Sequence, residues 1–446
     1  MKSPSSPART SRSNSFRSAD TMTLFVFVGS LLGAMAIGVP VAFSLMFCGV
    51  VLMWYMGMFN TAIIAQNMIS GADTFTLLAI PFFILAGELM NSGGLSRRII
   101  DFAIALVGHI RGGLGIVAIV AAIIMASISG SAAADTAALA AILIPMMAKA
   151  GYNIPRSGGL IAAGGIIAPV IPPSMAFIVF GVAANVSITQ LFLAGIVPGI
   201  LMGISLIIAW LIVVRKDNIK PLPKTSGKER LVATVRAGWA LGMPVIILGG
   251  IKAGIMTPTE AAVVAAGYAL FVGMVIYREL KPADLFHVLL RAAKSTSIIM
   301  FLVCAALVSA WLITAANIPN EVAGYIEPLI DRPMLLMVAM MVLVFIVGTA
   351  LDLTPTILIL TPVLMPIVKQ AGIDPVYFGV LFIINNAIGL ITPPVGVVLN
   401  VVSGVGRIPL GKVTIGVWPF LVAETIVLAL LVVFPDIVMV PLQYLR

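Results

Sequence analysis

The sequence is poor in charge, cysteine and histidine, and each shortage excludes a class of protein. Only 10% of the 446 residues are charged, against about 25% in a typical soluble domain. With 61% hydrophobic residues and a mean hydropathy of +1.16, we expect an all-α protein that crosses a membrane several times. The two cysteines, Cys48 and Cys304, lie in apolar runs, so the sequence suggests neither a disulfide framework nor a metal cluster.

The sequence also lacks the motifs on which common enzyme classes depend. It contains no HExxH zinc motif, no P-loop and no dinucleotide-binding fingerprint after a strand. The two histidines, His109 and His287, are isolated, and neither belongs to a Ser, His and Asp set that would suit a hydrolase. We therefore expect a protein that is not an enzyme and that uses no organic cofactor.

The second half of the chain repeats the glycine and proline pattern of the first half. Residues 129–173 and 350–394 align without a gap at a spacing of 221 residues. The matched pairs are Pro145 and Pro366, Gly151 and Gly372, Gly158 and Gly379, Pro172 and Pro393, Pro173 and Pro394, Gly195 and Gly416, and Pro198 and Pro419. Because these residue types fix where helices break, we interpret the chain as two diverged copies of one unit. Two ordinary kinked helices are the alternative, but several polar interruptions recur in register.

The two copies are predicted to share one plan. The first repeat covers residues 22–214, with a hairpin at 113–148 and a broken helix at 158–186, and the second covers 237–435, with a hairpin at 333–371 and a broken helix at 376–404. The arms of the first hairpin are shorter than the roughly 20 residues of a full crossing, so we expect re-entrant hairpins. Each repeat then has about five crossings, one hairpin and one interfacial arm helix, near residues 94–109 and 320–330.

Three segments lie outside the predicted repeats. Residues 1–21 are rich in Ser and Arg, and we expect a disordered tail or a mis-assigned start before Met22. Residues 215–236 form a long polar linker, and residues 436–446 form a C-terminal tail. The linker separates the two repeats and carries many of the basic residues.

The basic residues predict how the chain is oriented in the membrane. An odd number of crossings in each repeat makes the two repeats inverted. With residue 22 outside, eighteen of the 26 Lys and Arg residues face the cytoplasm, four lie outside and four belong to residues 1–21. We therefore expect both mature ends to be periplasmic and the linker to be cytoplasmic. The first hairpin would enter from the cytoplasm and the second from the outside.

The predicted hairpin tips carry polar groups that suit a cation. At Ser129–Ser131, two hydroxyls and free carbonyls suit a hard monovalent cation, and the next helix offers amide dipoles to an anion. The matching tip, residues 350–354, contains Asp352, whose charge is costly at membrane depth unless a cation neutralises it. Helix capping is the alternative role for Asp352 and for the serines. For Asp135 we favour a hydrogen-bonding role over direct ligation.

The two double prolines mark helix breaks that expose backbone carbonyls. These breaks lie at Ile171–Ser174 and Thr392–Pro394. The asparagines that flank the second break suit either a polar solute or a contact between helices, and they are Asn385, Asn386 and Asn400. Glu424 is an intramembrane acid for which the sequence offers no partner. Paired interruptions of this kind point to the binding site of a transporter.

Six short motifs resemble those of the large membrane subunit of TRAP (tripartite ATP-independent periplasmic) transporters. They are Ile80–Met90 (IPFFILAGELM), Ser129–Ser131 (SGS), Ile171–Ser174 (IPPS), Leu193–Leu201 (LAGIVPGIL), Thr257–Ala262 (TPTEAA) and Asn386–Gly396 (NAIGLITPPVG). The resemblance, over residues 22–435, implies sodium-coupled uptake of an organic acid by an elevator-type fold similar to the ion-transporter superfamily. It also implies a bacterial inner-membrane location and two partners, a periplasmic substrate-binding protein and a small four-helix membrane subunit.

The resemblance also implies two sodium sites and one substrate site. The sodium residues would be Ser129, Gly130, Ser131, Ile171 and Pro172 at the first tip and break, and Ala350, Asp352, Thr354, Thr392 and Pro393 at the second. The substrate residues, between the tips, would be Ser131, Pro173, Ser174, Thr354, Asn385, Pro394 and Asn400. The alternatives are a sodium/carboxylate symporter that needs no binding protein, and a membrane scaffold subunit that transports nothing. Dicarboxylate, keto acid, sugar acid and sialic acid all stay open as substrates.

Overall fold

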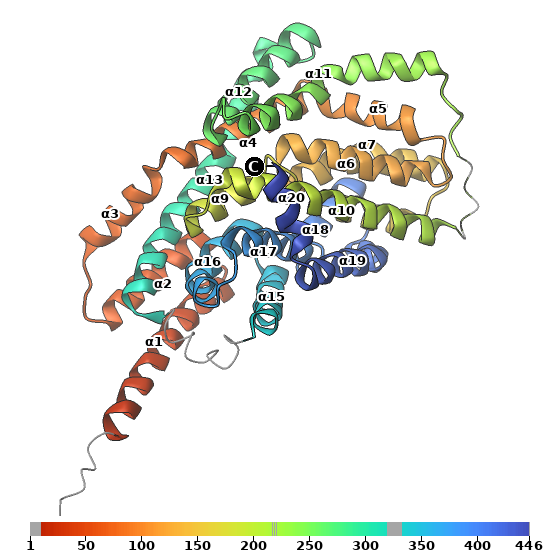
Figure 1. Cartoon of the computed structure of the whole chain (residues 1–446). Helices are drawn as coiled ribbons and strands as arrows, with labels where there is room; N and C mark the ends of the chain where they lie inside the picture. The colour runs from red at the N-terminus through yellow and green to blue at the C-terminus, as the bar shows by residue number, and fades with distance from the viewer. Residues whose placement is uncertain (1–9, 216, 218, 220, 319–331, 446) are drawn as a thin grey trace, which may run out of the picture. The chain divides into compact units, whose positions relative to one another are not determined.

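A computed structural model of the chain shows a protein built from helices (Figure 1). It describes residues 10–215, 217, 219, 221–318 and 332–445, and every regular element in these ranges is helical. Within the same ranges, nine helical segments are long and apolar enough to cross a membrane. The prediction of an all-α polytopic membrane protein is confirmed, while the inverted relation of the two repeats stays a prediction.

The chain divides into two compact units, each assembled from separate stretches. The first unit contains Met1–Thr74, Ile298–Leu336 and Leu358–Gly372. Its helices are α1 (Thr10–Ala36), α2 (Val41–Tyr55), α3 (Thr61–Ala72), the second half of α13 (Pro282–Ala315) and most of α16 (Leu353–Gln370). Within this unit α1 packs on α2, and α2 packs on α13 through the rings of Phe43 and Phe301, whose centroids lie 5.1 Å apart.

The second unit contains Phe75–Ser297, Met337–Ile357 and Ile373–Arg446. Its elements are η1 (Phe75–Leu78), α4 (Ala79–Ser92), α5 (Leu95–Val107), α6 (Gly113–Ser129), α7 (Ala132–Lys149), α8 (Ile154–Gly165), α9 (Met175–Ala184), α10 (Ile188–Val214), α11 (Gly227–Lys252), α12 (Pro258–Phe271), the π-helix η2 (Val272–Ile276), the first half of α13, most of α15 (Pro333–Ala350), α17 (Pro375–Gly389), α18 (Val397–Gly406), α19 (Leu410–Val433) and α20 (Asp436–Leu445).

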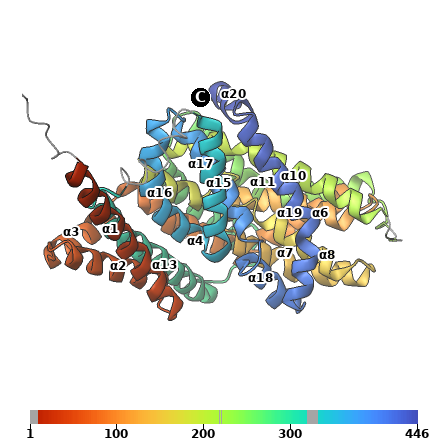
Figure 2. The ribbon, with the colours of Figure 1, turned by 90° about the horizontal axis from the view of Figure 1, so that it is seen from below.

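Close helix crossings hold the core of the second unit together. A Cβ atom placed on Gly159 of α8 would lie 2.4 Å from the carbonyl carbon of Gly416 on α19, so only a glycine fits at this crossing. Small residues of this kind let membrane helices approach closely. The two broken helices also meet, because the Phe180 ring of α9 packs against Phe378 and Phe382 of α17. Figure 2 shows α19 beside both α10 and α8.

Several segments differ from the sequence prediction at their boundaries. α1 begins at Thr10, so the described part of segment 1–21 is helical where disorder was expected. α11 begins at Gly227, inside the predicted linker 215–236, because Ser226 and Glu229 form a capping box that starts the helix early. The tail at 436–446 contains the helix α20. α5 occupies most of the predicted first arm helix, and the second, at 320–330, lies outside the described residues.

Candidate functional site: paired hairpin tips and helix breaks

The first tip joins α6 to α7 through two residues, Gly130 and Ser131. Gly130 has φ = 61°, in the left-handed region that glycine adopts readily at the end of a helix. Ser131 caps α7, because its Oγ accepts a hydrogen bond from the amide of Ala134 at 3.4 Å. The tip therefore combines the carbonyl end of one helix with the amide end of the next.

The first tip packs against the first helix break. α8 ends at Gly165 and α9 begins at Met175, so residues 166–174 lie between two helices. A Cβ atom on Gly130 would lie 2.7 Å from the carbonyl oxygen of Pro173 and 3.2 Å from the amide nitrogen of Met175. A side chain here would therefore push the tip off the break. The structure brings Ser129–Ser131 together with Pro173 and Ser174, two residues that were predicted at the substrate site.

Ser174 shapes the break with its side chain. It is fully buried, and its Oγ donates a hydrogen bond to the carbonyl of Pro169 at 2.5 Å. The same oxygen accepts from the amide of Phe177 at 3.3 Å, which caps α9. Ile171 and Pro172, predicted at the sodium site, are also buried. The hydroxyl of Ser174 is thus engaged within the break itself.

A buried carboxylate lies behind the first tip. Asp135 is 1% exposed, and its Oδ1 accepts a hydrogen bond from Ser129 Oγ at 2.5 Å. Ser129 Oγ in turn accepts from the amide of Ser131 at 3.2 Å. The carboxylate therefore fixes the hydroxyl that orients the tip, which is the kind of role that we favoured for Asp135.

Asp135 also lines a small cavity that the sequence did not reveal. This cavity of about 10 Å³ is lined in part by Asn91 of α4, Ser96 of α5 and Asp135. Ser96 Oγ donates to Asn91 Oδ1 at 2.7 Å, whereas Asp135 Oδ2 has no hydrogen-bond partner among the described residues. Neither Asn91 nor Ser96 belongs to a motif or a repeated position, so no signal in the sequence marks them.

The second tip joins α15 to α16 through Leu351 and Asp352. Asp352 is exposed in this chain, and its Oδ1 accepts from the amide of Leu353 at 2.8 Å. This places the carboxylate at the amide end of α16, and it leaves one face of the carboxylate open. Of the other predicted sodium residues here, Ala350 is exposed and Thr354 is half-buried.

The second tip contacts the second broken helix through Asn386. This residue of α17 is fully buried, and its Nδ2 donates to the carbonyl of Leu353 at 3.1 Å. Its Oδ1 has no partner within the described part of the chain. α17 also lies close to α15, since a Cβ atom on Gly389 would be 2.6 Å from the carbonyl of Gly348. The second tip thus lies against the helix that leads into the second break.

The remaining predicted residues of the second break have different surroundings. Thr392 is buried and its hydroxyl donates to the carbonyl of Ile388 at 2.8 Å, while Pro393 is half-buried and Pro394 is exposed. Asn385 is buried and donates to the carbonyl of Met341 at 2.5 Å, so it joins α17 to α15. Asn400 is exposed and donates to the carbonyl of Val395 at 2.8 Å. Both double prolines contain a cis peptide bond.

Glu424 finds a partner that the sequence could not indicate. It is fully buried in α19, and Ser205 of α10, 219 residues away, donates to its Oε1 at 3.4 Å. Its Oε2 has no hydrogen-bond partner among the residues that the structure describes. This intramembrane acid therefore contacts a neighbouring helix. It lies far along the sequence from both tips.

The fold and the site together define a class of protein. The part of the chain that the structure describes is a helical, multi-pass membrane protein with two broken helices at matching positions of the sequence, an arrangement typical of secondary transporters. Residues 28–437 match the family described as "Tripartite ATP-independent periplasmic transporter, DctM component", and the chain belongs to this family. The resemblance seen in the sequence motifs is confirmed.

Relatives cover nearly the whole chain. The 2,3-diketo-L-gulonate TRAP transporter large permease protein YiaN of Escherichia coli is 54% identical over 95% of this chain and all of its own length. The sialic acid large permease SiaM of Vibrio cholerae is 42% identical, over 92% of this chain and 96% of its own. The C4-dicarboxylate large permease DctM of Pseudomonas aeruginosa is 39% identical, over 84% and 88%. These relatives are named as permeases, and this chain is a transporter subunit, not an enzyme.

A solved structure supports the fold. The crystal structure of the YdaH transporter of Alcanivorax borkumensis matches this chain with a TM-score of 0.59 and 14% sequence identity. The match covers 83% of this chain and 86% of that chain. At this identity the likeness concerns the path of the helices, and it agrees with a multi-pass transporter fold.

Proposed function

We propose that this chain is the permease through which an organic acid crosses the bacterial inner membrane, driven by sodium ions. The observation that carries the proposal is the pairing of a hairpin tip with a broken helix, which occurs twice. Ser129–Ser131 packs on Pro173, and Leu353 is hydrogen-bonded to Asn386. Non-helical backbone at membrane depth is tolerated where it is enclosed by protein or lines a cavity, and such places bind solutes and ions.

Helix polarity suggests where the ions and the acid bind. α6 and α15 end at the tips, so their last carbonyls present partial negative charge to a cation. α7 and α16 begin at the tips, so their first amides suit the carboxylate of a substrate. Sodium would use the residues predicted at each tip and break, and the acid would use Ser131 and Thr354 between them. Asp352 would add a full negative charge at the second tip.

The names of the relatives support the class of substrate. They transport 2,3-diketo-L-gulonate, sialic acid and C4-dicarboxylates, according to those names, and all of these are carboxylates. We therefore place the substrate of this chain among organic carboxylates. The family supports two partners, a periplasmic binding protein that delivers the acid and a small membrane subunit.

The division of the chain into two units supports an elevator mechanism. Both tips and both broken helices belong to the second unit, whereas α1, α2 and α3 belong to the first. A substrate site confined to one unit can move with that unit across the membrane. In this proposal the second unit carries the acid and the first unit stays in place.

Uptake into proteoliposomes tests the proposed function. The chain and its small subunit would be reconstituted with and without the binding protein, and with and without an inward sodium gradient. Uptake of a radiolabelled carboxylate that needs both additions supports the proposal. Uptake with sodium alone would favour the symporter that needs no binding protein, and uptake that ignores sodium would contradict ion coupling.

A further inference from the structure

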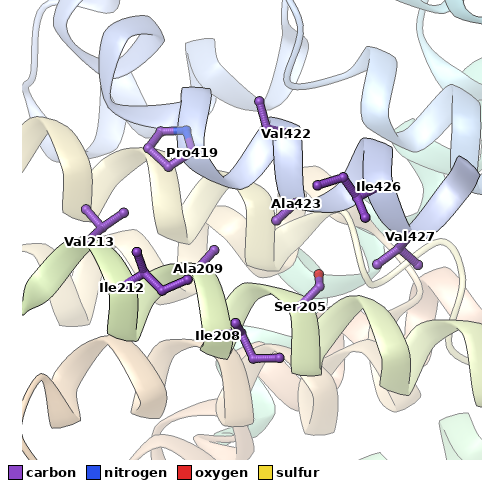
Figure 3. Close-up of a pocket in the computed structure, with 10 residues that line it drawn as sticks. All are labelled: Ser205, Ile208, Ala209, Ile212, Val213, Pro419, Val422, Ala423, Ile426 and Val427. Atoms are coloured by element: carbon purple, nitrogen blue, oxygen red, sulfur yellow. The ribbon is translucent and has the colours of Figure 1, made fainter. Parts of the chain in front are cut away.

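An apolar groove runs between α10 and α19 on the second unit (Figure 3). It has a volume of about 370 Å³. Its floor is made of small side chains, Ser205, Ala209 and Ala423, and its rims include Ile212 and Ile426, which are 59% and 60% exposed. A narrow floor between two raised aliphatic rims suits a thin, flexible hydrocarbon chain.

The groove lies between two helices that qualify as membrane spans. Ile188–Val214 and Leu410–Val433 are both long and apolar enough to cross a bilayer. Ser205 is the polar side chain among the residues that line the groove, and its hydroxyl is engaged with Glu424 behind the floor. The groove therefore offers nothing to a polar solute, and at this depth the surrounding medium is hydrocarbon.

The length of the groove distinguishes an acyl chain from a helix. Its residues on α10 extend from Ser205 to Val213, which is about 12 Å at 1.5 Å per residue. The hydrocarbon core of a bilayer is about 30 Å thick, so the groove spans roughly one leaflet. A transmembrane helix of another subunit would need a contact surface along the whole span, whereas a lipid needs one leaflet.

Two arginine side chains, Arg111 and Arg156, contact the backbone at the end of α10, where the groove ends and Arg215 follows the helix. Arg156 Nη1 lies 3.5 Å from the carbonyl oxygen of Val213, a groove residue, and 2.8 Å from Asp217 Oδ2. Arg111 Nη2 donates to the carbonyl of Arg215 at 3.0 Å, and the side chains of Arg111 and Arg215 are exposed. Asp217 is the single carboxylate that these contacts bring to the cluster, so a positive charge remains. Guanidinium groups bind phosphate well because their N–H donors match its oxygens.

We propose that this groove binds an anionic phospholipid. One acyl chain lies between α10 and α19, and the headgroup phosphate lies among Arg111, Arg156 and Arg215. The lipid would lie in the leaflet that the end of α10 faces. This site is separate from the tips and breaks, and the inference does not rest on the proposed transport function.

Native mass spectrometry of the purified chain in detergent tests this proposal. The probes are phosphatidylglycerol and phosphatidylcholine with identical acyl chains. We expect phosphatidylglycerol to bind about five- to tenfold more tightly, because each basic residue near a headgroup strengthens the binding of an anionic lipid several-fold. The double variant Arg111→Gln and Arg215→Gln should lose this preference and still bind both lipids. The control is Lys252→Gln, at an exposed lysine that ends α11, and it should keep the preference for phosphatidylglycerol.

Two groove variants test the place of the acyl chain. Ala209→Phe and Ala423→Phe fill the floor from opposite helices, and each should weaken the binding of both lipids at least fivefold. Ile204→Phe, at an exposed position of α10 outside the groove, is the matched control. Equal binding of the two lipids by the native chain would overturn the proposal. Unchanged lipid binding in a groove variant that keeps the native melting temperature would overturn it as well.

Discussion

The carboxylate of Asp135 holds the first tip through Ser129. Removing this carboxylate frees the Ser129 hydroxyl, which then no longer orients the amide of Ser131. We expect Asp135→Ala to raise the sodium concentration for half-maximal uptake about tenfold, since a hydrogen bond to a charged group contributes about 1.5–3 kcal/mol. Sodium titration of uptake in proteoliposomes measures this. Asp284→Ala, at an exposed residue in the first turn of α13, serves as the control and should leave the sodium titration unchanged. An unaltered titration in Asp135→Ala would refute the positioning role.

Substitutions of Asp352 can distinguish the two roles that the sequence left open for it, which are capping of α16 and sodium binding. Capping of α16 needs only an oxygen acceptor, and asparagine caps a helix about as well as aspartate. The sodium site that we propose at this tip would depend on the negative charge of the carboxylate. We expect both Asp352→Ala and Asp352→Asn to weaken sodium activation of uptake by roughly tenfold, or about 1.4 kcal/mol. A sodium titration in which Asp352→Asn behaves like the native chain would assign this residue to capping alone.

Helix breaks could be predicted from single residues, whereas contacts between helices could not. The breaks at Ser129–Ser131 and Pro172–Pro173 were predicted because serine, glycine and proline act on the local backbone. The contact of Asn386 with Leu353 and that of Ser205 with Glu424 join different helices. Such contacts depend on how helices pack, and the spacing of residues within one helix does not reveal them.

At the scale of helices, the crossing of α8 and α19 depends on Gly416. A Cβ atom there would lie 2.0 Å from the carbonyl oxygen of Pro155, so the helices would have to separate. We expect Gly416→Val to destabilise the folded protein by about 1–3 kcal/mol, as overpacking of a core does. The melting temperature of the detergent-purified chain should fall. Gly411→Val, in the same helix with nothing within 4 Å, should leave it unchanged, and equal melting of both variants would argue against this crossing.

Helix boundaries show what local patterns can reveal. The sequence Ser226-Gly-Lys-Glu229 is a capping-box pattern, and it explains why α11 begins ahead of its apolar run. Hydropathy alone placed the start of this helix near residue 237, because the first ten residues of α11 include four charged ones, Lys228, Glu229, Arg230 and Arg236. The break at the first tip follows from a local signal as well, since α6 ends at Gly130 in a left-handed conformation.

At the scale of the whole molecule, hydropathy was sufficient for the fold class. A bilayer leaves a spanning chain few choices besides helices, so apolar runs in a charge-poor sequence predict them. The two compact units could not be predicted, because each combines stretches that are far apart in the sequence, and α13 contributes to both. Packing groups residues 298–318 and 332–336 with the N-terminal helices, and the assignment of the chain to two repeats stays a prediction.

The orientation of the chain gives a further prediction. The positive-inside rule places the linker in the cytoplasm and the loop after α11 outside. In a chain with Cys48→Ala and Cys304→Ala, a cysteine at Lys224 should be labelled by an impermeant maleimide only after the membrane is opened. A cysteine at Lys252 should be labelled in intact spheroplasts. Labelling of both positions from the same side would disprove the predicted topology.

The central claim is that the two hairpin tips bind sodium, and thermal unfolding of the purified chain tests it most directly. A ligand that binds only the folded state raises the melting temperature as its concentration rises. We predict a saturable rise in sodium chloride that potassium chloride at equal ionic strength does not produce, and a smaller rise in Asp352→Asn. Identical melting curves in the two salts would contradict the account.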